Sequence, residues 1–308
     1  LIMDDTNPAP RMLTRPGEGI YNDSAGAVEA NSPFQVVWMD EGERTGCLET
    51  IAAEARKRGL DDKPQVVFEG NAPAQVDSDK EVARALAGAP EPGSPRFFVG
   101  APNAIKGPTE IVFARQSGSN LMVVGQRDDV VEAMTAVAIR ILRARLGDTC
   151  RLIVIDSTVA DPNGKSWLKD TLPRIGNDIE VPGSHEIGDT INALAAELRE
   201  ATDSGTPPER STVVFLLGLQ RFKKLRYEED FSFSLESDGG ETKPANSLDE
   251  LIREGPAFGF HTVVSIDTWN SINRCLNRKA ISEFEMKILF QMSAADSASL
   301  IESGKASD

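Results

Sequence analysis

The feature that most constrains the fold is a set of short, continuous apolar segments separated by helical patterns. Three of them, residues 120–125 (NLMVVG), 151–156 (RLIVID) and 211–218 (STVVFLLG), contain very few polar side chains, which is typical of strands buried on both faces. Helical spacing separates the strands and is clearest over residues 128–146, with acids at its start and arginines at its end. Strands that alternate with helices predict an α/β fold, with a mainly parallel sheet and helices on both faces.

Weaker patterns extend this fold in both directions. We expect an antiparallel pair over residues 96–115, and we expect an N-terminal strand/helix extension in which residues 33–40 form a buried strand. The Gly- and Pro-rich segment 88–95 marks a boundary between the two parts. The remaining expected strands are 65–69, 178–183, 261–266 and 286–292, and the remaining expected helices are 41–58, 77–86, 166–172, 187–201, 248–254 and 295–302.

Composition excludes several classes of protein. The chain has 308 residues, a formal net charge of −15, three cysteines and two histidines. The cysteines lie far apart, so neither a disulfide framework nor a cysteine-based zinc site is expected, and we expect no metal site. No apolar run approaches the roughly 20 residues that a membrane span requires, which favours a cytoplasmic protein without a membrane segment. The chain does not begin with Met, so we interpret it as an excised part of a longer protein.

The turn after residues 120–125 is where a phosphate-binding loop would lie. The frame G-x-x-x-x-G-K-[ST], started at Gly125, places Val130 at its second glycine, Val131 at its lysine and Glu132 at its hydroxyl residue. Like charges 4 Å apart repel by about 4 kcal/mol at an effective dielectric of about 20, so acids in this frame disfavour a triphosphate. The vestigial nucleotide-binding frame comprises Gly125, Gln126, Arg127, Asp128, Asp129, Val130, Val131 and Glu132.

The second half of such a site is also incomplete. A strand like 211–218 ends, in an active phosphoryl-transfer site, in acids that hold Mg²⁺. Here the strand ends at Leu217 and Gly218 without a carboxylate. The segments 163–166 (NGKS) and 303–305 (SGK) lack the rest of the frame, so we interpret them as turns. We expect no catalytic residue and no cofactor for this module.

Four stretches carry a resemblance to a known family: residues 116–126, 211–222, 254–271 and 284–308. In their order the chain resembles the FtsK/SpoIIIE family of the HerA–FtsK superfamily of P-loop motors. The resemblance implies a RecA-like P-loop NTPase core, with ATP and Mg²⁺ as the family's cofactors. In the family this core forms a hexameric ring that moves double-stranded DNA, and a subgroup with tandem, partly degenerate modules serves type VII protein secretion. It also implies that Asp267 stands near the family's sensor position.

The resemblance extends to the organisation of the chain. Residues 14–38 look like the closing hairpin of a family motor module. We therefore predict three parts: residues 1–45 as the tail of a preceding module, 46–94 as a connector, and 95–308 as a RecA-like ATPase-like domain that is truncated at its C-terminus.

A basic cluster lies directly after the strand 211–218. Arg221, Lys223, Lys224 and Arg226 fall within seven residues of an otherwise acidic chain. We predict that these four residues form the main positive patch, available for DNA or for an acidic partner.

These observations favour a degenerate, non-hydrolysing ATPase-like module that acts in ring assembly or regulation of a DNA translocase or segregation protein. Its partners would be other motor modules in a ring, with DNA or protein as cargo. One alternative is an active ATP-driven translocase of double-stranded DNA. Another is a peptide- or protein-docking module of a type VII-like secretion motor, which an exposed apolar groove near Val130 and Leu219 would favour.

Overall fold

The structure is a computed structural model of the chain. It describes residue 3 and residues 6–60, 75–76, 79–88, 90, 93–102, 107–157, 179–227 and 243–307. The expected strand 65–69, the expected helix 166–172 and the NGKS turn lie outside these residues. The chain divides into two compact units, Leu1–Val67 and Phe68–Asp308, which are described separately. The three-part division proposed above stays a prediction.

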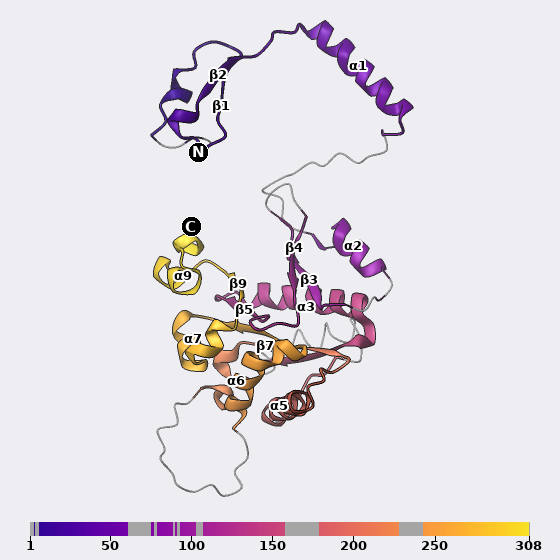
Figure 1. The fold of residues 1–308 in the computed structure, drawn as a ribbon, viewed down its shortest axis with the longest axis vertical. Helices are drawn as coiled ribbons and strands as arrows, with labels where there is room; N and C mark the ends of the chain where they lie inside the picture. The colour runs from indigo at the N-terminus through magenta and orange to yellow at the C-terminus, as the bar shows by residue number, and fades with distance from the viewer. Residues whose placement is uncertain are drawn as a thin grey trace, which may run out of the picture. The chain divides into compact units, whose positions relative to one another are not determined.

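The larger unit is built on a parallel sheet (Figure 1). Within the described residues it has five strands in the order β6-β7-β8-β5-β9, and every neighbouring pair is parallel. This arrangement confirms the expected α/β fold with a mainly parallel sheet. It also brings all five carboxyl ends to one edge. The strands are β5 (Leu121–Val124), β6 (Cys150–Asp156), β7 (Ser211–Leu217), β8 (Phe260–Ile266) and β9 (Met286–Leu289).

Alternate side chains of each strand enter two separate cores. In β6, Ile153 and Ile155 pack into one core, whereas Leu152 and Val154 pack into the other. The first core is closed by α5 (Ile187–Ser204), α6 (Pro244–Glu254), α7 (Trp269–Cys275) and α8 (Arg278–Ser282). The second is closed by α2 (Lys80–Ala87), α3 (Asp128–Leu146) and the antiparallel pair β3 (Arg96–Gly100) and β4 (Thr109–Val112). Helices therefore cover both faces, as expected.

A buried polar side chain ties the amino end of β5 to its surroundings. The Asn120 amide donates to the carbonyls of Ile252 (2.8 Å) and Glu283 (3.0 Å), and its oxygen accepts from the Thr262 amide (2.9 Å). A fully satisfied buried amide fixes the positions of the segments that it joins. These bonds therefore join α6, β8 and the turn before β9 to the start of β5.

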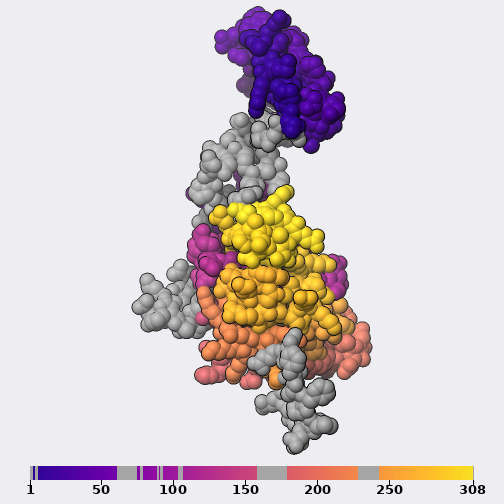
Figure 2. Space-filling view, turned by 90° about the vertical axis from the view of Figure 1, so that its left-hand side faces the viewer, coloured from indigo at the N-terminus to yellow at the C-terminus, as the bar shows by residue number. Residues whose placement is uncertain are grey.

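The segments from β8 onward form much of one face of the larger unit, coloured orange to yellow in Figure 2. They include α9 (Ala294–Ile301), which the Ser293 side chain caps through the Asp296 amide at 3.1 Å. The described 3₁₀ turns of the chain are Ala9–Met12, Val28–Ala30, Gly147–Thr149, η6 (Leu219–Arg221), η7 (Lys223–Leu225), Gly255–Phe258 and Gly304–Ser307. The expected strand 178–183 is reduced, where described, to a bridge between Glu180 and Ile153.

The smaller unit has a hairpin and a helix. Its strand β2 (Ser32–Gln35) pairs with β1 (Glu18–Tyr21) in antiparallel register, and the helix is α1 (Glu41–Lys57). The strand expected at 33–40 thus forms over a shorter range, and it pairs with β1. The expected burial of its apolar side chains is wrong: Trp38 is 88% exposed. A two-stranded hairpin has no second layer to cover either face.

Among the described residues, the structure contains no helix with the length and apolar character needed to cross a bilayer.

Candidate functional site

The turn after β5 contains a glycine that the packing requires. Gly125 has φ +146°, and a Cβ there would lie 2.7 Å from the Cβ of Phe290. Its amide donates to the Ile266 carbonyl at 3.0 Å, so the backbone is held against β8. Only glycine adopts this conformation without strain. Packing alone therefore explains why residue 125, the first glycine of the predicted frame, is glycine, and no bound phosphate is needed to explain it.

The N-terminus of α3 is covered by a charged pair from its own first turn. The Arg127 guanidinium donates two hydrogen bonds of 3.0 Å to the Asp129 carboxylate. These bonds, aided by the Arg127 charge and the amides of Val130 and Asp129 and opposed by desolvation, lower the pKa of Asp129. A helix N-terminus attracts anions. Here the carboxylate of Asp129 already supplies one.

A second arginine reaches across the carboxyl edge of the sheet. Arg221, from η6 after β7, donates through Nη2 to Asp128 Oδ2 at 2.6 Å and through Nη1 to Ser157 Oγ at 3.2 Å. The arginine therefore links the segments that follow β7 and β6 to the start of α3. Both partners of the ion pair are about half exposed.

Two further carboxylates face this arginine. Glu132 is partly buried, and its pKa is raised by desolvation first, then by the charges of Asp156, Asp128 and Asp129, while Arg221 lowers it. Asp156 is 6% exposed and lies opposite Leu217 in the β6–β7 register. No group of three or more His, Cys, Asp or Glu side chains that could hold a metal ion occurs in the described ranges.

The residue that follows β7 packs against the residue that follows β6. Gly218 has φ +74°, and a Cβ there would lie 2.3 Å from Ser157 Oγ, so the Gly218 backbone packs directly against the Ser157 side chain. The Gly218 amide donates to Ser265 Oγ at 2.8 Å. The side chains that meet here leave a cavity of only about 10 Å³, roughly the minimum for one water molecule. The cavity is lined by Asp128, Val131, Glu132, Asp156, Ser157, Leu217, Gly218, Arg221 and Ser265.

The other predicted site residues lie apart from this cavity. Gln126 is exposed in the turn. Asp267, which was predicted to stand near a vestigial sensor position, is partly buried and accepts a hydrogen bond from Thr268 Oγ1 at 3.2 Å. Of the basic cluster, Lys223 and Lys224 are exposed, whereas Arg226 donates to the Gln220 carbonyl at 2.7 Å. The prediction of one continuous positive patch stays untested, and Arg221 turns inward to Asp128.

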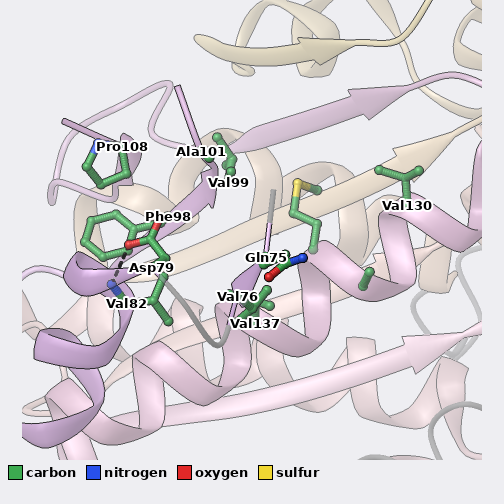
Figure 3. A pocket seen from close by; sticks show the side chains of 13 residues that line it. Gln75, Val76, Asp79, Val82, Phe98, Val99, Ala101, Pro108, Val130 and Val137 are labelled. Atoms are coloured by element: carbon green, nitrogen blue, oxygen red, sulfur yellow. Dashed lines mark hydrogen bonds between the residues drawn. The ribbon is translucent and has the colours of Figure 1, made fainter. Parts of the chain in front are cut away.

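A larger, mainly apolar pocket lies on the outer side of α3 (Figure 3). Its volume is about 310 Å³. The side chains in the close-up come from α2, β3, α3 and the segments next to them. The residues that line it are Gln75, Val76, Asp79, Val82, Phe98, Val99, Gly100, Ala101, Pro108, Val130, Ala133, Met134 and Val137.

The docking alternative would be favoured by an exposed apolar groove near Val130 and Leu219. Val130 lines this pocket, whereas Leu219 is fully buried in the core on the opposite face of the sheet. The signal in the sequence is the helical spacing of Val130, Met134 and Val137, which places them on one face of α3.

No protein-family model and no curated protein matches this chain. Solved structures with a similar fold include the conjugation coupling protein TcpA of pCW3, determined with ATPγS (10% identity, TM-score 0.47, 70% of this chain and 60% of that one). Others are the cytoplasmic domain of the type VII secretion ATPase EccC of Thermomonospora curvata (12%, 0.46, 74% and 27%) and the cytoplasmic domain of EssC (11%, 0.48, 94% and 55%).

The chain thus spans 27% to 60% of the length of these three structures. Identities of 10–12% describe a likeness of fold alone. The sheet's own topology establishes the α/β class.

Proposed function

We propose that the larger unit is a degenerate ATPase-like module that neither binds nor hydrolyses nucleotide and that acts in the assembly or regulation of a multi-module motor. The observation that carries this proposal is the closed carboxyl edge, where Arg221 and Asp128 meet across a cavity of about 10 Å³. A triphosphate needs far more space than one water molecule.

The side chains present do not fit ATP and Mg²⁺. Val131 stands at the lysine position and is 5% exposed in the core under α3, so no cation reaches a phosphate from there. Asp128, Asp129 and Glu132 would repel a phosphate at the start of α3, and β7 ends without an acid to hold Mg²⁺.

The active DNA translocase is a weaker proposal. It requires nucleotide binding at the closed edge and a basic surface for the phosphate backbone. The net charge of −15 opposes the approach of DNA, and two of the four basic residues make contacts within the chain. In our proposal the module works in the cytoplasm, in a ring with other motor modules.

A docking module is the second candidate, and the apolar pocket beside α3 favours it. At about 310 Å³ the pocket matches the lower range of ligand sites, and most of its lining is apolar. It lies beside the vestigial nucleotide site rather than within it, since Val130 lines this pocket while the neighbouring Val131 lines the closed cavity. A protein cargo or sister module with an apolar anchor would fit it.

Thermal unfolding with and without MgATP tests the main proposal. A ligand at 100 times its Kd stabilises the folded state by about 2.7 kcal/mol, which is several degrees in Tm for a unit of this size. We expect no shift with MgATP, MgADP or ATP without Mg²⁺, and no phosphate release. A saturable shift with MgATP together with turnover would overturn the proposal in favour of the translocase.

A further inference from the structure

We propose that Arg221 is an internal clasp: its guanidinium holds the carboxyl edge of the sheet closed by serving as the counter-cation for the acids of α3 and β6. This inference rests on the proposed function, because it concerns a site that nucleotide does not fill. It goes further by naming the chemical group that takes the place of a ligand.

The backbone around Arg221 is built for a close approach. After β7, Gly218 turns with φ +74° and lies so near Ser157 that a side chain there would overlap Ser157 Oγ. The Arg221 amide then donates to the Gly218 carbonyl at 2.9 Å, which forms the η6 turn. This turn places the guanidinium between Ser157 at the end of β6 and Asp128 on α3.

The carboxylates near Arg221 repel one another, and a cation among them reduces this repulsion. Asp128 and Asp129 lie in the first turn of α3 and Glu132 follows one turn later, and Asp156 of β6 lies close enough to Glu132 to raise the pKa of Glu132. Of the arginines that the structure describes at this edge, Arg127 donates to Asp129. Arg221 is the one whose charge opposes the rise in the pKa of Glu132.

The pair Arg127–Asp129 provides a matched control. It belongs to the same helix end and has bonds of 3.0 Å, but both side chains are at least 60% exposed and both come from one turn. An exposed pair of this kind contributes little to stability. Arg127→Ala therefore removes an arginine from the same end of α3 without unlinking β6, β7 and α3.

The experiment compares the Tm of Arg221→Ala, Arg221→Lys and Arg127→Ala in the whole chain, near neutral pH and near pH 5. We expect Arg221→Ala to lower Tm by about 3 °C or more near neutral pH and Arg127→Ala by less than about 1 °C. Lysine keeps the charge but not both bonds, so Arg221→Lys should fall between them. Asp128→Asn combined with Arg221→Ala should recover most of the loss, because it removes the charge left without its partner.

Acid should reduce the cost of losing the clasp. Without Arg221 the pKa of Glu132 rises further above its unfolded value, so the folded state binds the extra proton and the destabilisation shrinks as pH falls. The Tm gap between Arg221→Ala and the unchanged chain should therefore narrow from neutral pH to pH 5. An equal gap at both pH values, no recovery by Asp128→Asn, or a loss no larger than that of Arg127→Ala would overturn the clasp. Nucleotide binding by the unchanged chain would instead overturn the proposed function, so the two failures are distinguishable.

Discussion

Two apolar, strand-forming segments of this chain have opposite environments. In the larger unit, every residue of β5, β7 and β8 is buried. In the smaller unit, residues 36–39 (VVWM) follow β2 and all four side chains are exposed, from 45% to 88%. The composition of these segments is similar. What differs is burial: helices cover both faces of the sheet, whereas every residue of β2 is exposed.

The hairpin relies on polar contacts instead of an apolar core. The Asn7 side chain donates to the Gly26 carbonyl and to Asn31 Oδ1, and Asn22 donates to the Ala27 carbonyl and to the same Asn31 oxygen. A strand-like sequence therefore predicts pairing, while burial depends on what the rest of the fold places above it.

The largest expected effect contrasts one aromatic residue from each region. Phe215 in β7 is 1% exposed and packs against Phe97 with ring centroids 6.4 Å apart. Phe215→Ala should lower the free energy of unfolding by about 3–5 kcal/mol. Trp38→Ala should change it by less than about 0.5 kcal/mol, because Trp38 is exposed. Urea unfolding of both variants measures this. A cost for Trp38→Ala near that of Phe215→Ala would show that the exposed segment has a partner.

A smaller effect concerns acid. His261 in β8 is fully buried, stacks on Phe113 and shares a 2.9 Å hydrogen bond between Nδ1 and the Ser119 carbonyl, while its Nε2 has no hydrogen-bond partner among the described residues. Desolvation first, and the charge of Arg115, lower its pKa to about 4, although the Ser119 carbonyl opposes the shift.

The lowered pKa of His261 makes the larger unit less stable in acid. The unfolded chain takes up a proton at His261 near pH 6.5 and the folded chain only near pH 4, so stability is lost as pH falls through this window, by about 3 kcal/mol in total. His261→Asn should flatten that part of the stability profile. The smaller unit contains no histidine, so the amide exchange of the hairpin should not follow it. An unchanged profile in His261→Asn would contradict this assignment.

A third contrast uses two glycines. Gly125→Ala should destabilise the larger unit by about 1–3 kcal/mol, since it combines a strained φ with a clash against Phe290. Gly46, in the middle of α1, has open space around its position, so Gly46→Ala should stabilise the helix by about 0.5–1 kcal/mol. Circular dichroism during thermal unfolding distinguishes the two signs. If Gly125→Ala were neutral, the packing reason for this glycine would be wrong.

The regular elements of the larger unit were predictable from the sequence, because long apolar periods leave few alternatives. The helix expected over 128–146 and the strand expected over 211–218 form with nearly the same bounds. The helices α7 and α8 were missed. They are short, and their signals are single capping side chains, Thr268 and Asn277, which accept from the amides of Ser271 and Ala280.

The sequence indicated which segments line the cavity at the carboxyl edge, but it did not reveal how their side chains interact. The motif frame located the turn after β5 and the end of β7, which do line one cavity. The bond between Arg221 and Asp128 joins residues 93 positions apart, and a pattern within either segment does not reveal it. The basic cluster therefore suggested an outward contact for an arginine that turns inward.

Isothermal titration of the chain with MgATP tests most directly whether the carboxyl edge of the sheet excludes nucleotide. We expect no binding heat up to millimolar nucleotide, because the chain's own side chains leave a cavity of only about 10 Å³ at the carboxyl edge. We also expect none for the triple change Val130→Gly, Val131→Lys and Glu132→Thr, since residue 131 is buried and Arg221 still crosses the site. A saturable isotherm for the unchanged chain with a Kd in the micromolar range, about −8 kcal/mol, would contradict this expectation.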